Sequence, residues 1–379
     1  MPRIVTLDFI RGIAILGILL MNIIAFALPK AAYVNPAWQG MPTVGEFLVW
    51  AAQDLLAQAK FLTLFAMLFG AGLQLLLPRG GRWLQSRLIW LCVLGLLHGL
   101  LLWEGDILLA YGLTGLLVWR MIRDVATPRQ LINTGLLLYL VGSGVLVVLG
   151  MGAGSQPGSG WLPGAAAVQY ETFWRTHGGS EALLNRLDMV GDALIALAVQ
   201  YVWQLAGLMM IGAALMRNGW LQGHFDTAHY RRTGWRLVAA GMAIELPSIV
   251  LQYLTGWDFR WSGFFLQVPR EIGAPLQSLG YAALCFGYWP ALPERLTAAV
   301  SRVGRMALSS YLLQTLICTT LFNSLGWFNQ FSRAQLLLMV PAIWAVNLLF
   351  SWLWLKRFRQ GPLEWLWRWL TQRCGGSVR

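Results

Sequence analysis

The first apolar span of this chain begins with LDFIRGIAILGILLMN, residues 7–22, and places an acid and an arginine where lipid tolerates neither. A charge at membrane depth is costly, so such a side chain usually faces the protein interior or a wet cavity. Asp8 and Arg11 are three residues apart and can pair on one helix face. Arg11 and Asn22 lie three turns apart on nearly the same face, and Gly12 leaves room for another helix. The span therefore predicts a polar stripe on a membrane helix, with the other helices packed around it.

The composition of the whole chain is that of a membrane protein. Of its 379 residues, 57% are hydrophobic and only 12% are charged, about half the charged share of soluble domains. The 21 tryptophans suit the aromatic belts at the two membrane surfaces. The net charge of +12 is spread in single residues and short clusters between apolar runs, so it indicates topology and no nucleic-acid partner. The four cysteines lack CxxC spacing and predict neither disulfides nor a metal site.

Apolar runs long enough to cross hydrocarbon predict an all-α integral membrane protein with about ten transmembrane helices. The predicted spans lie near 7–28, 60–78, 83–103, 107–123, 130–150, 190–216, 234–255, 272–293, 305–323 and 335–356. The shorter segment 44–58 carries several polar side chains and predicts an interfacial or re-entrant helix. The exits of the even-numbered spans are rich in arginine and lysine, and those of the odd-numbered spans are poor in them. The positive-inside rule then predicts that both termini are cytoplasmic.

The segment 151–189 divides the chain into two membrane halves. Residues 1–150 hold spans one to five, and residues 190–379 hold spans six to ten with a short cytoplasmic tail. The segment begins with a flexible glycine- and serine-rich tract and continues with a more structured part around Tyr170 and Trp174. On the predicted topology it is extracytoplasmic. It either caps an outward-facing cavity or merely connects the two halves.

A candidate catalytic group lies in the outer half of the predicted bilayer. His98 is about 8 Å below the outer end of span three, and Asn22 has a similar depth in span one. Glu104 and Asp106 follow span three directly. A histidine in this place is a suitable general base when its pKa lies near the working pH. The alternatives are a packing hydrogen bond for His98 and a helix cap for Asp106.

Other spans carry polar side chains at similar depth and predict a shared cavity. Glu245 is notable because it precedes Pro247, a residue that frees a backbone carbonyl within the membrane. At the edge of span two, a lysine either snorkels to the surface or faces the cavity. The predicted cavity residues are Lys60, Gln200, Gln204, Glu245, Tyr311 and Gln314. Each alone is explained by helix packing, and together they favour one cavity.

Arginines at the cytoplasmic mouth predict a phosphate-bearing ligand such as coenzyme A, because guanidinium groups match phosphate oxygens. Arg11, supported by Asp8, and Arg305 before span nine are the candidates. For most arginines at this surface, topology and anionic lipid are a sufficient explanation. Arg11 lies within a span, so topology and anionic lipid do not explain its position.

Four groups of residues, spread over nearly the whole chain, carry a family resemblance. They are LDFIRGIAILG (7–17) with Asn22, KF (60–61) with LFG (68–70), His98 with GDIL (105–108), and GRMALSSYLLQ (304–314) with GPLEWLWR (361–368). With these motifs the chain resembles the YeiB-like bacterial inner-membrane proteins. The resemblance implies the cytoplasmic membrane of a bacterium as the location.

The first span is more distantly similar to the transmembrane acyltransferase superfamily. This group includes bacterial sugar O-acyltransferases and heparan-alpha-glucosaminide N-acetyltransferase, which take acyl groups from cytoplasmic acyl-CoA to an acceptor on the far side. Its members carry an arginine or lysine followed eleven residues later by a histidine. Arg11 matches the cation, and Asn22 stands in the place of the histidine. Asparagine is no general base at neutral pH, so either His98 has taken that role or the scaffold serves another purpose.

Two hypotheses follow from these residues and from the resemblance. In the first, Arg11 anchors acetyl-CoA or another acyl-CoA, His98 oriented by Glu104 or Asp106 deprotonates the acceptor, and Asn22 holds the oxyanion. The acceptor is a small molecule, a glycan or a lipid, and no metal is expected. In the second, a transporter or lipid-handling protein uses the same polar cavity without acyl transfer. Membrane lipids are expected partners in both, and both allow a homodimer.

Overall fold

The computed structural model describes residues 4–154 and 156–375, and within them the protein is all-helical apart from an isolated bridge between Trp38 and Gly40. The elements up to residue 201 are α1 (Val5–Ala27), α2 (Lys30–Val34), α3 (Val44–Leu56), α4 (Lys60–Leu76), η1 (Leu77–Arg79), α5 (Gly81–Leu101), α6 (Leu108–Asp124), α7 (Pro128–Gly152), α8 (Ala165–His177), α9 (Gly179–Ala196) and η2 (Leu197–Tyr201). The elements that follow are α10 (Val202–Arg217), η3 (Trp220–Gln222), α11 (Thr227–Leu254), α12 (Phe259–Gly263), η4 (Phe265–Gln267), α13 (Val268–Tyr288), η5 (Trp289–Ala291), α14 (Glu294–Arg305), α15 (Ala307–Thr319), η6 (Thr320–Ser324), α16 (Arg333–Arg357) and α17 (Pro362–Gly375).

Local sequence signals set several of the helix starts. Capping boxes, in which a hydroxyl and an amide or carboxyl side chain satisfy each other's backbone N–H groups, open α3, α7 and α16. In α3, Thr43 N–H donates to Glu46 Oε2 over 2.9 Å. The following helix α4 begins after Ala59, whose φ of 64° turns the chain sharply between the two helices. The segment predicted at 44–58 is therefore a helix that leads directly into the second span.

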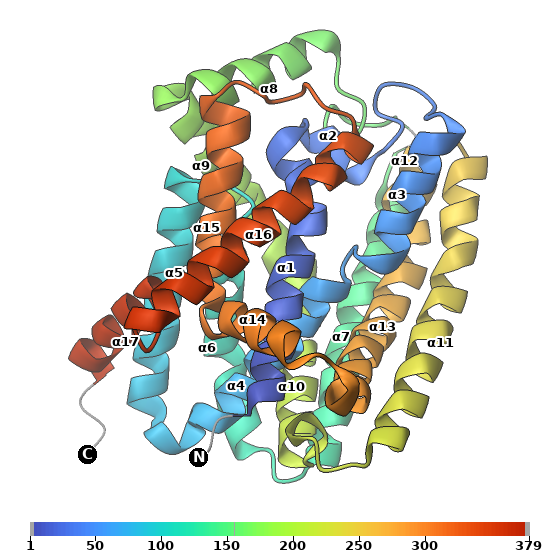
Figure 1. Ribbon diagram of the computed structural model, residues 1–379. Helices are drawn as coiled ribbons and strands as arrows, with labels where there is room; N and C mark the ends of the chain where they lie inside the picture. Colours follow the sequence, from blue (N-terminus) through green and yellow to red (C-terminus); the bar gives the residue numbers. More distant parts are fainter. Residues whose placement is uncertain (1–3, 155, 376–379) are drawn as a thin grey trace.

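Helix α1 lies at the centre of the molecule and is buried along most of its length (Figure 1). It packs against α4, α14, α15 and α16. Its contact with α14 is backbone to backbone, because a Cβ on Gly12 would lie 2.2 Å from Val300 O and one on Gly304 would lie 1.8 Å from Asp8 O. The close helix approach predicted at Gly12 is confirmed, and α14 is the helix that approaches.

The remaining helices surround this centre in packed pairs. Helix α11 lies beside α13, α10 lies between α7 and α4, and α5 packs against α6 and α17 (Figure 1). The pair α4–α10 depends on two small residues, since a Cβ on Gly70 would lie 1.9 Å from Met209 O and one on Gly212 would lie 1.9 Å from Met67 O. Small residues of this kind are typical of helix pairs in membranes.

Within the described residues, seven helical segments are long and apolar enough to cross a membrane. They are Val5–Ala27, Val44–Arg79, Gly81–Leu101, Pro128–Gly152, Gly179–Arg217, Thr227–Leu254 and Arg333–Arg357. The chain is accordingly a helical membrane protein. A helix lies on each of the ten predicted ranges, but α6, α13 and α15 with η6 do not reach this length and composition. The exact number of ten spans therefore stays a prediction.

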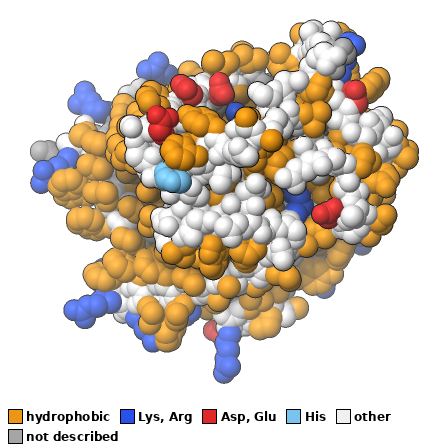
Figure 2. Space-filling view, turned by 90° about the horizontal axis from the view of Figure 1, so that it is seen from above, with side chains coloured by type: hydrophobic (Ala, Val, Ile, Leu, Met, Phe, Trp, Pro, Cys, Tyr) orange, Lys and Arg blue, Asp and Glu red, His pale blue; other side chains and the backbone are white. Residues whose placement is uncertain are grey.

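The segment predicted at 151–189 is partly helical. Helix α8 and the first turns of α9 form its second part, and α9 continues through η2 into α10. Helix α8 packs on η6 and α9 and crosses one end of the bundle (Figure 1), with Trp174 buried beneath it. Figure 2 looks onto this end, where lysine and arginine side chains are sparse on the face itself and stand out mainly around its margin.

Candidate functional site

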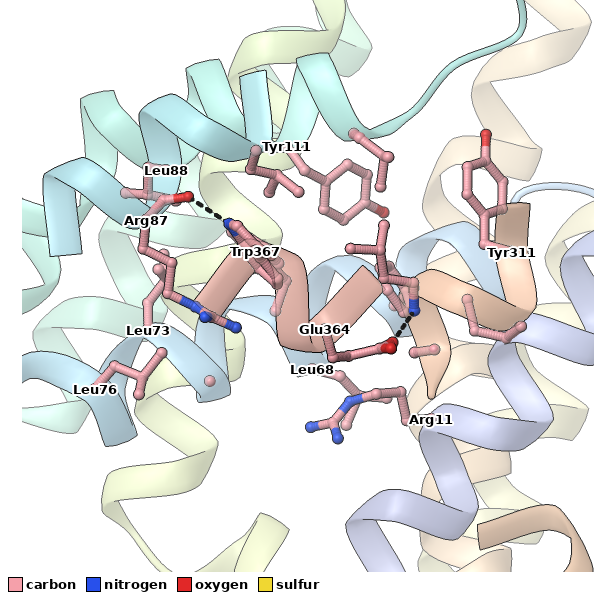
Figure 3. A pocket seen from close by; sticks show the side chains of 18 of the residues that line it. Arg11, Leu68, Leu73, Leu76, Arg87, Leu88, Tyr111, Tyr311, Glu364 and Trp367 are labelled. Carbon is pink, nitrogen blue, oxygen red and sulfur yellow. Dashed lines mark hydrogen bonds between the residues drawn. The ribbon is translucent and has the colours of Figure 1, made fainter. Parts of the chain in front are cut away.

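A cavity of about 370 Å³ lies between α1, α4, α5, α6, α15 and α17, and we call it the arginine cavity. Its charged residues are Arg11, Arg87, Arg305 and Glu364, and most of its wall is apolar, with leucine the commonest residue. Figure 3 shows the guanidinium groups of Arg11 and Arg87 on one side, with Tyr111 and Tyr311 across the cavity from them. The cavity thus has a basic end and an apolar body.

The arginines are held by neighbouring groups. Arg11 Nη1 lies 2.9 Å from Asp8 Oδ1, which confirms the pairing predicted from their spacing. Arg305 Nη2 donates to the backbone oxygen of Arg359 over 2.7 Å. The guanidinium of Arg87, which the sequence analysis did not select, lies 3.5 Å from the ring centroid of Trp367. Guanidinium groups fixed in this way are preorganised for an anionic ligand.

Helix α17 closes one side of the arginine cavity. Its Glu364 accepts the backbone N–H groups of Leu308 at 2.8 Å and Ser309 at 3.1 Å, and so caps the start of α15. Burial raises the pKa of Glu364, although these hydrogen bonds favour its carboxylate form. Trp367 Nε1 donates to Arg87 O over 2.8 Å. The helix is therefore attached to α5 and α15 at its cavity-facing residues.

His98 belongs to a buried hydrogen-bonded chain of three side chains. Its Nδ1 lies 2.8 Å from Asp106 Oδ1, and its Nε2 lies 3.0 Å from Thr315 Oγ1. The carboxylate favours a proton on Nδ1, which leaves Nε2 to accept the threonine hydroxyl. This carboxylate–imidazole–hydroxyl order is the one that activates nucleophiles in acyl transfer. The three side chains are almost completely buried.

Asp106 has both roles that the sequence left open. One carboxylate oxygen contacts His98, and the other accepts Leu109 N–H over 2.7 Å at the start of α6. Tyr311 connects this chain to the arginine cavity, because it lines the cavity and its ring centroid is 5.2 Å from that of His98. Its hydroxyl donates to Gly105 O over 3.3 Å. His98 therefore lies directly behind the tyrosine end of the cavity.

Glu104 takes part in a different ion pair. It lies 2.6 Å from Arg175 Nη2, and Arg175 Nε lies 3.0 Å from Glu171. Burial lowers the pKa of Arg175, but the two carboxylates outweigh it and raise that pKa above the ordinary value. Among the described residues no hydrogen bond joins Glu104 to His98. Of the two predicted orienting acids, Asp106 is the one in contact, and Glu104 ties the α5–α6 connection to α8.

Asn22 and Gln314 are both buried, and neither is in hydrogen-bond contact with His98 within the described chain. Gln314 Nε2 donates to Ile15 O over 3.3 Å, which joins α15 to α1. The side-chain amide of Asn22 makes no hydrogen bond to another described residue, and Asn22 lines neither the arginine cavity nor the second cavity described below. Its predicted role at an oxyanion stays a prediction.

Lys60 and Glu245 form an ion pair at the packed centre of α4, α11 and α13. Lys60 Nζ lies 2.5 Å from Glu245 Oε2 and donates to Asp54 O over 2.7 Å, and both charged side chains are fully buried. Gln277 Nε2 donates to the other Glu245 oxygen over 2.9 Å. Lys60 therefore does not snorkel, and its partner is the carboxylate beside Pro247.

The two glutamines predicted in span six point to different surroundings. Gln204 donates to Glu271 Oε2 over 2.9 Å and to Ser143 Oγ over 3.4 Å. Gln200 lines a second cavity of about 300 Å³ between α2, α3, η2, α11, α12, α13 and α16, which we call the glutamine cavity. Of the residues predicted to share one cavity, Tyr311 lines the arginine cavity, Gln200 lines the glutamine cavity, and Lys60 and Glu245 form a buried pair. Gln204 and Gln314 line neither cavity and bond to neighbouring helices.

Sequence reasoning missed several residues that these groups contain. Thr315 is 217 residues from His98 and carried no signal in the sequence. Arg270 and Glu271 follow Pro269 just before the apolar run that begins at 272, and a charged residue close to a proline at the edge of a span is a signal that could have found them.

Known proteins resemble the chain over its whole length. A family model described as "Protein of unknown function (DUF418)" matches residues 215–373. "Uncharacterized protein YeiB" of Escherichia coli (strain K12) is 60% identical over 379 residues, which cover 100% of this chain and 98% of the relative. "Uncharacterized protein YxaH" of Bacillus subtilis (strain 168) is 29% identical over 401 residues, with 97% of this chain and 93% of the relative covered. Because the E. coli relative is 60% identical to this chain over its full length, this protein belongs to the YeiB-like family.

Proposed function

We propose that this protein is a ten-span transmembrane acyltransferase of the bacterial inner membrane, which takes an acyl group from cytoplasmic acyl-CoA to an acceptor at the outer face. Both termini then lie in the cytoplasm, on the side of the arginine cavity's basic end. The observation that carries the proposal is the arginine cavity, in which fixed guanidinium groups meet an apolar body. The resemblance to acyltransferases inferred above from Arg11 and the position eleven residues later supports the same function.

The cavity suits an acyl donor for two physical reasons. Guanidinium groups bind phosphate oxygens with geometry that water does not match, and Arg11, Arg87 and Arg305 supply them at one end. The leucine-rich wall removes methylene groups from water, at about 0.8 kcal/mol for each buried CH₂. An acyl chain directed away from the arginines would point toward Tyr311, behind which His98 lies.

The proposed transfer uses His98 as the general base. An acceptor hydroxyl replaces Thr315 at His98 Nε2 and gives its proton to that nitrogen, while Asp106 holds the imidazole from the other side. The acceptor oxygen attacks the thioester carbonyl carbon, and the carbon–sulfur bond breaks. The departing sulfur takes the proton from His98 and leaves as the coenzyme A thiol. The acceptor carries the acyl group as an ester.

A second function is lipid handling or transport without acyl transfer. It is favoured by the state of His98, whose two ring nitrogens are both bonded and whose side chain is only 1% exposed. In that case the arginine cavity holds a phospholipid or another anionic amphiphile as cargo, and the His98 chain only locks α5 against α15.

Binding of acyl-CoA to the purified protein tests the proposal first. We expect longer acyl chains to bind more tightly than acetyl-CoA, and Arg11→Ala and Arg87→Ala to weaken binding by about tenfold or more, because each removes a charge-assisted contact. Arg82→Ala is the matched control, since Arg82 lies on α5 with Arg87 but is exposed and outside the cavity. The measurement is isothermal titration in a nonionic detergent.

His98→Asn then separates the two functions. If the protein is an acyltransferase, the variant binds acyl-CoA as the wild type does but releases free thiol far more slowly in the presence of an acceptor. No acyl-CoA binding by the wild type would contradict the acyltransferase proposal. Binding of anionic phospholipid at the same arginines, with no thiol release, would establish the lipid-handling function in its place.

A further inference from the structure

The glutamine cavity has polar groups that the protein itself leaves available. Gln200 is 6% exposed and Gln252 is 3% exposed, and both line the cavity. Neither amide makes a hydrogen bond to another described residue. A buried amide without a partner is costly, so amides kept in such a place are typical of a binding site. The volume of about 300 Å³ is roughly ten times the ~30 Å³ that one water molecule occupies in the liquid.

The charges in the cavity wall are only partly paired. Arg270 Nη1 lies 3.0 Å from Asp54 Oδ1, and these two neutralise each other. Arg333 donates only to neutral acceptors, Gln53 Oε1 at 2.8 Å and Ala32 O at 2.7 Å. Glu271 accepts only from neutral donors, as described above for Gln204. Within the described chain, Arg333 and Glu271 therefore each lack an oppositely charged group within ion-pair distance.

We infer that the glutamine cavity binds a small zwitterion, with its anionic group at Arg333 and its ammonium group at Glu271. Arg333 and Glu271 have only longer-range counter-charges in this wall, Asp54 and Arg270 respectively. A ligand that carries both charges is therefore favoured over a ligand with either one alone, because each incompletely compensated charge in a partly buried site is penalised. The amides of Gln200 and Gln252 supply neutral hydrogen bonds to the rest of the ligand. The site is independent of the acyl-CoA proposal, since it shares no lining residue with the arginine cavity.

A series of matched ligands tests the charge requirement on the wild-type protein. β-Alanine and phosphoethanolamine carry both charges, propionate and ethylamine carry one each, and glucose carries none. In a nonionic detergent we expect both zwitterions to bind and the other three to bind at least about tenfold more weakly, as loss of one ion pair requires. Equal binding of glucose or of a single-charge analogue would overturn the inference, as would failure of both zwitterions to bind.

Two variants assign the charges to their residues. Arg333→Gln should abolish the preference for β-alanine over ethylamine, and Glu271→Gln should abolish its preference over propionate. If Arg333 or Glu271 has only a structural role, its substitution would weaken the binding of every ligand by a similar factor, and that result would contradict the assignment. Arg333→Lys should retain binding, and Arg357→Gln at the other end of α16 and Glu294→Gln on α14 are the matched controls. If a variant does not fold, the ligand series on the wild type still decides.

The zwitterion has two sources, a free small molecule or a lipid headgroup, and a competition experiment distinguishes them. We would measure β-alanine binding to protein in nanodiscs of phosphatidylcholine with and without phosphatidylethanolamine. Loss of β-alanine binding with phosphatidylethanolamine supports the headgroup as the natural ligand. Unchanged binding supports a free solute.

Discussion

Lys60 and Glu245 form an ion pair whose contribution to stability depends on its complete burial. Both side chains are fully buried, and each charge has its counter-ion at 2.5 Å. Lys60 also donates to Asp54 O, and Glu245 also accepts from Gln277. Taking two charges out of water costs several kcal/mol for each ion, and their attraction offsets that cost only while both are present. The pair therefore joins α4 to α11 while both charges are present, and removal of either partner leaves the other charge buried without a counter-ion.

Removing one partner should be much more harmful than removing both. We expect Lys60→Met to lower the free energy of unfolding by about 3–5 kcal/mol, because it leaves a buried carboxylate without its counter-ion. In the double variant Lys60→Met with Glu245→Gln, the free energy of unfolding should fall by less than the sum of the decreases in the two single variants. Thermal midpoints of the purified proteins provide the measurement. The control is Lys356→Met, which changes an exposed lysine near the end of α16. A Lys60→Met protein as stable as this control would contradict the prediction.

For His98, the sequence predicted a buried polar residue, and the structure adds the side chains that it contacts. Its position in the sequence predicted a polar group deep in the membrane, and Asp106, eight residues later, is in reach of it through the α5–α6 connection. Thr315 completes the chain from the opposite half of the protein. Whether this chain performs chemistry is decided by the thiol-release experiment, since the geometry of its three groups is compatible with both catalysis and packing.

At the scale of elements, the contact between α4 and α10 depends on backbone approach. Gly70 and Gly212 face each other's helix so closely that an added Cβ would overlap a carbonyl oxygen. Neither oxygen belongs to a flexible side chain, so a methyl group at either position requires a movement of the whole helix. Because α4 also lines the arginine cavity, such a movement would reach the proposed donor site.

A glycine pair on the same helix tests this dependence. We expect Gly70→Ala to lower stability by about 1–3 kcal/mol or more, as overpacking does. Gly72→Ala, where an added Cβ meets nothing within 4 Å, should be neutral or stabilising by up to about 1 kcal/mol through helix propensity. Thermal midpoints should therefore fall for the first variant and not for the second. Equal thermal midpoints would contradict the prediction, because they would show that α4 and α10 can move apart without a loss of stability.

At the scale of the whole molecule, the arrangement in the membrane is open to a direct test by cysteine labelling. Cys374 is an exposed cysteine in α17, near the end of the described chain, and Ser159 is exposed in the segment before α8. With both termini in the cytoplasm, an impermeant maleimide should label Cys374 only after cells are opened. A Ser159→Cys protein should be labelled in intact cells. The opposite pattern would invert the topology and place the arginine cavity away from cytoplasmic acyl-CoA.

The sequence by itself determined the class of this protein, the positions of its long apolar helices and the family that it resembles, but not the helices α14 and α17. Lipid offers no hydrogen bonds to the backbone, so apolar runs of about 20 residues must be helical, and composition and run length suffice to find them. The pair Asp8–Arg11 was equally predictable, because a spacing of three residues on a helix brings side chains together whatever the tertiary structure.

Only the tertiary structure decided which polar residues meet. Lys60 and Glu245 are 185 residues apart, and Arg333 faces the glutamine cavity from the last span while Glu271 faces it from α13. Hydropathy shows that a residue lies within a span but not the direction in which it points or the helix that covers it. Helix packing sets those directions through close glycine contacts, and it distributes the polar residues expected in one cavity over separate cavities and buried polar clusters.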